Sequence, residues 1–200
     1  MMNSIAIFCG SALGCDPAYL QAAQLAGKTL AQHGIALVYG GGRSGLMGMV
    51  ADSALQAGGK VIGVIPKQLV DRELAHPHLT ELHVVENMHQ RKTLMSELSD
   101  GFIAIPGGAG TLEEIFEQWT WAQLGIHLKP CAFLNTAGFY DDLLKFIQMT
   151  ADKGFTHQRF SSSLAVSESI EEILAQFKAY QAPQPKWGMA ADQQGLVQQA

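Results

Sequence analysis

One segment of the chain reads Phe102-Ile103-Ala104-Ile105-Pro106-Gly107-Gly108-Ala109-Gly110-Thr111-Leu112-Glu113-Glu114. It joins a short apolar run to a helical pattern through a glycine-rich turn. The run Phe102–Ile105 is typical of a buried strand, and Pro106 ends it. The helical pattern covers Thr111–Leu124. A strand that passes through a tight turn into a helix is the repeating unit of a parallel α/β sheet.

The same alternation continues along the rest of the chain. Further strands are expected at Ser4–Cys9, Ile35–Tyr39, Lys60–Ile65, Leu82–Val85, Cys131–Leu134 and Ala165–Val166. Further helices are expected at Asp16–His33, Ser44–Ala57, Asn87–Leu98, Phe139–Lys153 and Ser169–Tyr180. Because the strands do not alternate in polarity, both faces of the sheet must be covered. We therefore predict an α/β fold, a three-layer doubly wound (Rossmann-like) parallel sheet with helices on both faces.

Length and composition suit one domain. The chain has 200 residues, of which 48% are hydrophobic and 16% are charged, which is enough for one well-buried core. We predict a single domain over residues 1–180. The composition then shifts toward Gln and Pro, so residues 181–200 are expected to form a flexible tail. Residues 66–80 form a long irregular segment, and loops of that length are often functional.

Charge and cysteine usage argue against several kinds of partner. The formal net charge of −5 is unfavourable for binding nucleic acid or an anionic membrane. No apolar run approaches the roughly 18 residues of a membrane span, and the N-terminus does not resemble a signal peptide. Three cysteines form no Cys-x-x-Cys pair, so we expect a reduced, cytoplasmic protein. Cys9 and Cys131 lie in apolar runs and are expected in the core.

Three turns rich in glycine or small residues follow predicted strands, at Cys9–Ala12, Gly40–Gly48 and Pro106–Glu114. Carboxyl ends of parallel strands share one edge of the sheet, where such folds bind ligands. Glycines let the backbone approach an anion, and a helix N-terminus offers free N–H groups, so phosphate is the expected ligand. Glycines that only permit tight turns are the alternative for each loop alone, but three such turns at one edge favour binding.

The second loop also fits Gly-x-Gly-x-x-Gly, at Gly40, Gly42 and Gly45. A dinucleotide fingerprint normally follows the first strand and is followed by an acidic residue at the end of the next. Here the motif follows the second strand, and the third strand ends without a carboxylate. An NAD site is therefore disfavoured. Ser11 of the first turn and Gly42 of the second remain candidate substrate contacts.

Two sets of charged residues lie near this edge. Glu113 and Glu114 occupy the first turn of a helix, where carboxylates also have the ordinary role of favouring the helix dipole. They point about 100° apart, so they cannot share one role, and the apolar stripe of the helix does not choose between them. Arg91 and Lys92 lie on a helix that opens at the same edge. Such a pair is usually solvated, but here it could meet a phosphate or position a carboxylate.

Three histidines, His76, His78 and His83, lie in or near the irregular segment. The spacing His76-x-His78 could suggest a metal ion, but no cysteine or carboxylate cluster completes a ligand set. We interpret these histidines as surface loop residues and expect no metal site.

Taken together, Gly40–Gly48, Met88–Lys92 and Pro106–Glu114 resemble the Lonely Guy family of cytokinin riboside 5′-monophosphate phosphoribohydrolases, often mislabelled lysine decarboxylases. The resemblance runs from Ile5 to Tyr180 and includes the segment Thr120–Pro130. It differs at Ala109, where many members carry an aromatic residue, and this difference affects the shape of the pocket.

The resemblance implies hydrolysis of AMP, or of an N6-modified AMP, to the free base and ribose 5-phosphate. It implies no metal or organic cofactor and at least a dimer. It assigns catalysis to Arg91 and Glu114, and the choice of Glu114 over Glu113 rests on it. The implied substrate contacts are Glu73, Lys92, Gly108, Ala109, Gly110, Thr111, Leu112, Glu113 and Thr120.

A homodimer is also suggested by Trp121, which lies nearly opposite the core residue Trp119 on their helix. Two other functions stay open. A non-catalytic nucleotide or molybdenum-cofactor carrier of the same fold would keep the glycine loops, although the Arg and Glu residues favour an enzyme. A lysine decarboxylase would need a pyridoxal phosphate lysine with supporting groups, and we find no such constellation.

Overall fold

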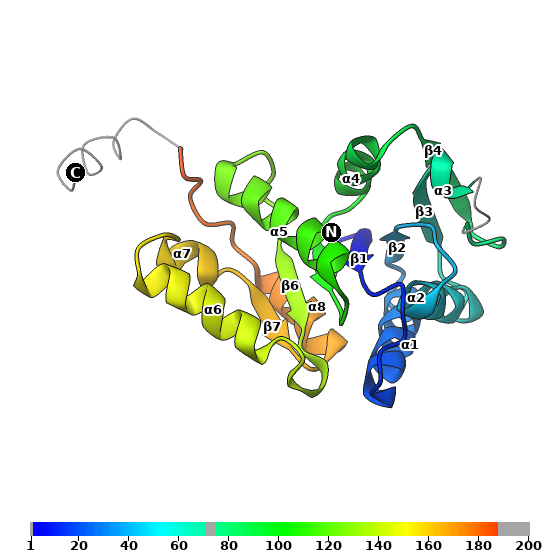
Figure 1. The fold of residues 1–200 in the computed structure, drawn as a ribbon, viewed down its shortest axis with the longest axis horizontal. Helices are drawn as coiled ribbons and strands as arrows, with labels where there is room; N and C mark the ends of the chain where they lie inside the picture. Colours follow the sequence, from blue (N-terminus) through cyan, green and yellow to red (C-terminus); the bar gives the residue numbers. More distant parts are fainter. Residues whose placement is uncertain (1, 71–74, 188–200) are drawn as a thin grey trace.

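The structure is a computed structural model that describes residues 2–70 and 75–187. Its centre is a seven-stranded parallel sheet with the order β4-β3-β2-β1-β5-β6-β7 (Figure 1). The strands are β1 (Ser4–Phe8), β2 (Ala36–Tyr39), β3 (Val61–Pro66), β4 (Glu81–Val85), β5 (Phe102–Ala104), β6 (Cys131–Leu134) and β7 (Ala165–Ser167). The order reverses between β1 and β5, which is the point at which doubly wound sheets bind ligands.

Helices cover both faces of this sheet, which confirms the predicted fold class. One core is shared by α1 (Pro17–Gln32), α2 (Gly45–Gln56) and α8 (Ile170–Ala179). The core on the other face is shared by α4 (Met88–Glu97), α5 (Ala109–Leu124), α6 (Asp141–Asp152) and the short α7 (Gln158–Ser161). Along β1, Ile5 and Ile7 face the first core, while Ala6 and Phe8 face the second. This two-sided burial is why the central strands are apolar, whereas the edge strand β4 is largely exposed and carries Glu81 and His83.

Every predicted strand and helix is present, with ends shifted by at most two residues. Three short elements were not predicted: α3 (Lys67–Val70), the 3-10 turn η1 (Thr136–Gly138) and α7. Each is too short to show the helical spacing of apolar residues on which the prediction relies. Within the two described ranges, no helix is long and apolar enough to cross a bilayer.

Beyond Tyr180, the described chain contacts the rest of the fold through the backbone of Gln184 and Lys186. The backbone N–H of Lys186 donates to the Gln123 carbonyl at the end of α5 (2.7 Å), and Arg159 Nε donates to the Gln184 carbonyl (3.0 Å). Carbonyl groups in the last turn of a helix lack partners within the helix, so they can accept hydrogen bonds from an extended segment that lies beside it. Residues 188–200 lie outside the described part of the chain.

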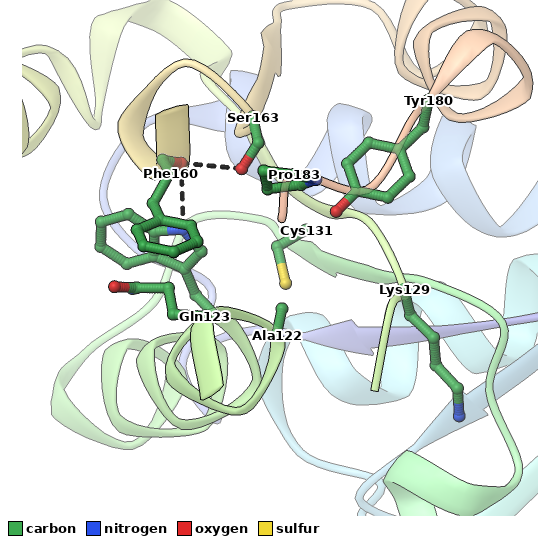
Figure 2. A pocket seen from close by; sticks show the side chains of 9 residues that line it. Ala122, Gln123, Lys129, Cys131, Phe160, Ser163, Tyr180 and Pro183 are labelled. Atoms are coloured by element: carbon green, nitrogen blue, oxygen red, sulfur yellow. Dashed lines mark hydrogen bonds between the residues drawn. The ribbon is translucent and has the colours of Figure 1, made fainter. Parts of the chain in front are cut away.

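Figure 2 shows where this segment closes over the end of α5, with Pro183 and Tyr180 beside Cys131. The enclosed space is about 10 Å³, which is room for at most one water molecule. Ser163 Oγ and Trp119 Nε1 both donate to the Phe160 carbonyl, at 2.8 and 3.2 Å. The cavity is therefore a packing feature and not a ligand site.

The expectation that all three histidines lie on the surface is wrong for His76. This residue is only 6% exposed, and its Nε2 lies 3.0 Å from Asp52 Oδ1 on α2. A buried imidazole needs a hydrogen-bond partner. The partner of His76 lies 24 residues away in sequence, so the local apolar pattern could not reveal the burial. His78 is exposed and His83 is partly exposed.

Candidate active site

A pocket of about 310 Å³ lies at the carboxyl ends of the central strands, beside the switch point between β1 and β5. A volume of this size suits a small organic ligand. Its walls come from the turn after β1 and from the N-terminal parts of three helices, α2, α4 and α5. The lining residues are Cys9, Gly10, Ser11, Met47, Met88, Arg91, Gly108, Ala109, Gly110, Thr111, Glu113 and Glu114.

Other surface hollows, of about 430, 500 and 410 Å³, are at least as large. Among the described residues that line them, the charged side chains are Lys60, Lys28 and Lys178, and there is no carboxylate. Chemistry rather than volume therefore selects the pocket at the switch point, because it alone of these four combines a cation with carboxylates.

The turn from Pro106 to Thr111 forms the floor of this pocket and is shaped to hold an anion. Helix α5 begins at Ala109, two residues earlier than predicted, with Gly108 as an N-cap that has no capping side chain. The first N–H groups of such a helix have no partner within it. A Cβ atom at Gly108 or Gly110 would meet nothing within 4 Å, so the backbone on this side is open. A helix N-terminus with free N–H groups and an open backbone is an arrangement that can bind phosphate.

The three loops predicted to meet at this edge are hydrogen-bonded to one another. Gly10 N–H donates to the Pro106 carbonyl (3.0 Å), and Leu46 N–H donates to the Gly10 carbonyl (3.1 Å). A Cβ atom at Gly107 would lie 2.1 Å from Thr111 Oγ1 and 2.8 Å from the Gly10 nitrogen. Glycine at this position therefore lets the loops pack closely enough to share one pocket.

Arg91 of α4 and Glu114 of α5 meet inside the pocket. Arg91 Nη2 lies 3.4 Å from Glu114 Oε1, and the two side chains are only 10% and 12% exposed. Arg91 Nη1 donates weakly to Met88 Sδ, and the buried Nε lacks a hydrogen-bond partner in the described structure. The guanidinium therefore keeps donor capacity for a ligand.

The surroundings of Glu114 change its acidity. Burial raises the pKa of its carboxyl above the ordinary value, the Arg91 guanidinium lowers it, and the neighbouring Glu113 carboxylate raises it again. The net direction is upward. A buried carboxylate with a raised pKa, held beside a cation, can take part in proton transfer or stabilise a developing positive charge.

The structure separates the two glutamates that the helical pattern could not. Glu113 has a side chain that is 54% exposed, and it pairs with Lys92. Lys92 Nζ also lies 3.0 Å from Glu117 Oε1, so this cation bridges α4 to α5. Glu114 is buried and faces Arg91, which gives the two carboxylates different environments.

The other sequence-predicted residues divide into two groups. The pocket brings together Arg91 and Glu114 with Ser11, Gly108, Ala109, Gly110, Thr111 and Glu113. Four predicted contacts do not line it, and these are Gly42, Lys92, Leu112 and Thr120. Thr120 is exposed on α5. Glu73 lies outside the described residues.

Four lining residues were not singled out as contacts from the sequence: Cys9, Gly10, Met47 and Met88. Met47 and Met88 lie inside two of the recognised motifs, which is the signal that could have found them. Burial raises the pKa of the Cys9 thiol, and the Glu114 carboxylate adds to this, which disfavours the nucleophilic thiolate. Cys9 and Cys131 are buried, as predicted. Within the described ranges, no group of three or more metal-ligating side chains is present.

The fold and this site define a Rossmann-like protein with a glycine-rich anion cradle and a buried Arg–Glu pair. The chain belongs to the Lonely Guy family, and the matching family model, described as "Possible lysine decarboxylase", covers residues 47–177. It is 48% identical to the cytokinin riboside 5′-monophosphate phosphoribohydrolase of Rhodococcoides fascians, over 88% of this chain and 90% of that one. A relative of the same name from Oryza sativa subsp. japonica is 44% identical, over 95% of this chain and 78% of that one.

Among solved structures, the molybdenum cofactor binding protein from Rippkaea orientalis is similar in fold. The TM-score is 0.68 at 23% identity, covering 90% of this chain and 97% of that one. At this level of identity the similarity concerns the fold alone.

Proposed function

We propose that this chain hydrolyses the N-glycosidic bond of AMP or of an N6-modified AMP, releasing the free base and ribose 5-phosphate. The observation that carries the proposal is the buried Arg91–Glu114 pair, which opens into the same pocket as the anion cradle at Gly108–Thr111. The activity in the names of relatives at 44–48% identity supports the same reaction.

In this mechanism the cradle holds the 5′-phosphate. Backbone N–H groups at the start of α5 bind the phosphate oxygens, which fixes the ribose near the carboxylate. The C1′–N9 bond breaks with its electron pair passing to the base, and positive charge builds on the ribose. Glu114 stabilises this charge and accepts a proton from the attacking water, whose oxygen bonds to C1′. The departing base takes one proton at nitrogen from solvent, and Glu114 returns the proton from the attacking water to solvent, so that the sum is AMP plus water giving base and ribose 5-phosphate.

Arg91 has a supporting part in this step. Its guanidinium lowers the pKa of the Glu114 carboxyl and so favours the ionised form. The guanidinium also lines the pocket, where its Nη groups can donate to the nucleotide. The resemblance assigns contacts to Glu73, Lys92 and Thr120 as well. Lys92 is committed to Glu113 and Glu117, so it supports the α4–α5 contact in this proposal and reaches a ligand only indirectly.

The test is incubation of the pure protein with AMP, adenosine, N6-isopentenyl-AMP and lysine, followed by chromatography. We expect free base from both nucleotides and much less from adenosine, which has no phosphate for the cradle. A non-catalytic carrier would bind nucleotide without consuming it. Carbon dioxide and an amine released from lysine would contradict the proposal.

Changing Gly40 tests how closely Arg91 is held. A Cβ atom at Gly40 would lie 1.8 Å from Arg91 Nη2, so Gly40→Ala must displace the guanidinium. The displaced atoms end a flexible side chain, so we expect the fold to persist and kcat for AMP hydrolysis to fall about tenfold. Steady-state kinetics with a melting curve measures both. Gly34→Ala, at the opposite end of the sheet, is the control for backbone strain alone: its φ of +67° should lower the melting temperature, but kcat should not change. Unchanged kcat in Gly40→Ala would contradict this position of Arg91.

The raised pKa of Glu114 predicts the pH profile. Since the ionised carboxylate is the active form, kcat/KM should rise with pH through this ionisation, at a higher pH than an ordinary glutamate. The Glu113 carboxylate raises the pKa of Glu114, so Glu113→Gln should move this acid limb to lower pH. A limb that stays in place or moves upward in Glu113→Gln would contradict the assignment.

We also infer a cytoplasmic homodimer that pairs through the outer side of α5. Trp121 is only partly buried there, and the loop that follows exposes Ile126 and Leu128, which are 62% and 58% exposed. Apolar side chains gathered at one helix end favour a partner surface. Light scattering at micromolar concentration tests this, and a monomer would contradict it.

A further inference from the structure

We propose that His76 and Asp52 are positioning residues that hold the loop Gly40–Gly42 against the guanidinium of Arg91. The inference rests on the proposed function, since it concerns the same Arg–Glu pair. Neither residue lines the pocket, and neither belongs to the recognised motifs.

His76 joins three segments of the chain. Its Nε2 lies 3.0 Å from Asp52 Oδ1 on α2, and its Nδ1 accepts the backbone N–H of His78 (3.2 Å). These partners place the ring proton on Nε2, from which it is donated to the carboxylate. The backbone N–H of His76 donates to the Gly41 carbonyl (2.9 Å). A residue whose side chain is only 4% exposed thereby anchors the second glycine loop to helix α2.

The loop needs such an anchor because it has no side chains of its own. It consists of three consecutive glycines, and Gly41 has a φ of +74°, in the left-handed region. Its position is set by backbone contacts, namely the bond from His76 and the bridge between Gly42 and Ala75. Loss of the His76 ring leaves these backbone contacts in place but frees residue 76 from α2, and because glycine has the largest conformational freedom, the loop should then be able to move with it.

The loop in turn forms the wall behind Arg91. The guanidinium packs so closely on Gly40 that a Cβ atom there would lie 1.8 Å from Nη2 and 2.9 Å from Cζ. On its other side, Nη2 faces Glu114 Oε1 at 3.4 Å. A displaced loop would therefore change the distance between Arg91 and Glu114 while leaving the phosphate cradle on α5 in place.

The experiment compares His76→Ala, Asp52→Ala and Asp52→Asn with wild type, using AMP hydrolysis and melting temperature. We expect His76→Ala and Asp52→Ala to lower kcat about tenfold with much smaller changes in KM, because the cradle is untouched. Asp52→Asn keeps an acceptor for Nε2–H and should recover most of the loss. His33→Ala is the control, since this imidazole bonds to the Thr29 carbonyl at the end of α1, away from the pocket. Should His76→Ala fail to fold, the two Asp52 variants carry the test.

A double-mutant cycle separates positioning from general destabilisation. If His76 acts through Arg91, then His76→Ala should lower kcat much less in the Arg91→Lys background than it does in the wild-type background. An equal loss in both backgrounds, or a lower melting temperature with normal kcat, would overturn the inference.

A crystal structure of His76→Ala gives a readout that does not depend on turnover. We expect the Gly40–Gly42 loop to shift and the Arg91–Glu114 contact to lengthen beyond the present 3.4 Å. An unchanged contact would overturn the inference even with an active enzyme. Wild-type protein that releases no base from any nucleotide would instead refute the proposed function.

Discussion

Glu114→Gln is expected to lower kcat for AMP hydrolysis by about a thousandfold, the range typical of a lost general base or charge-stabilising carboxylate. The amide keeps the shape and an acceptor oxygen toward Arg91, but it cannot carry the negative charge that the ribose cation requires. Because the substituted group does not contribute to the phosphate cradle, KM should change far less than kcat. Steady-state release of adenine, with a melting curve for each variant, measures this.

The matched control is Glu113→Gln, a change of the same kind one residue earlier. Its carboxylate is half exposed and pairs with Lys92, so we expect a loss in kcat of less than about tenfold. If Glu113→Gln proved as damaging as Glu114→Gln, the assignment of roles to the two carboxylates would be wrong.

The second large effect is expected for Arg91→Met, which should lower kcat about a hundredfold. Methionine fills much of the space against Gly40 but supplies no charge and no hydrogen-bond donors. The Arg91 cation lowers the pKa of Glu114, so its removal should also move the acid limb of kcat/KM to higher pH. This is the opposite direction from Glu113→Gln, and a pH profile of both variants checks the sign.

Arg91→Lys serves as the conservative comparison. It keeps a positive charge but loses the planar fork that packs on Gly40, so it should keep the acid limb near its original pH while restoring only part of kcat. Full activity in Arg91→Met would show that Arg91 has no part in catalysis and would contradict its assigned role.

Much of this fold could be predicted, because the central strands are apolar on both faces and turn residues such as Gly40, Pro66 and Pro106 mark their ends. The alternation of apolar strands with helices along the chain indicates a parallel sheet, and the three glycine-rich or small-residue turns together indicate an anion site at its carboxyl edge. Because the carboxyl ends of parallel strands share one edge, the three loops were also expected to meet there. The hydrogen bonds from Gly10 to Pro106 and from Leu46 to Gly10 confirm that they do.

What could not be predicted depends on contacts between distant segments. Helical spacing left Glu113 and Glu114 equivalent, and only the position of α4 against α5 places one beside Arg91 and the other beside Lys92. His76 was interpreted as a surface residue because its partner on α2 is remote in sequence. The segment up to Trp187 was assigned to a tail because an extended chain without apolar period gives no sign of its anchor on α5.

The most direct measurement of the central claim is a product analysis of AMP incubated with wild-type protein and with Glu114→Gln at equal concentrations. We expect adenine and ribose 5-phosphate in equal amounts from wild type, and almost none of either from the variant although it still binds AMP. Equal rates of product formation by the two proteins, or AMP that is bound by wild type and recovered intact, would contradict it.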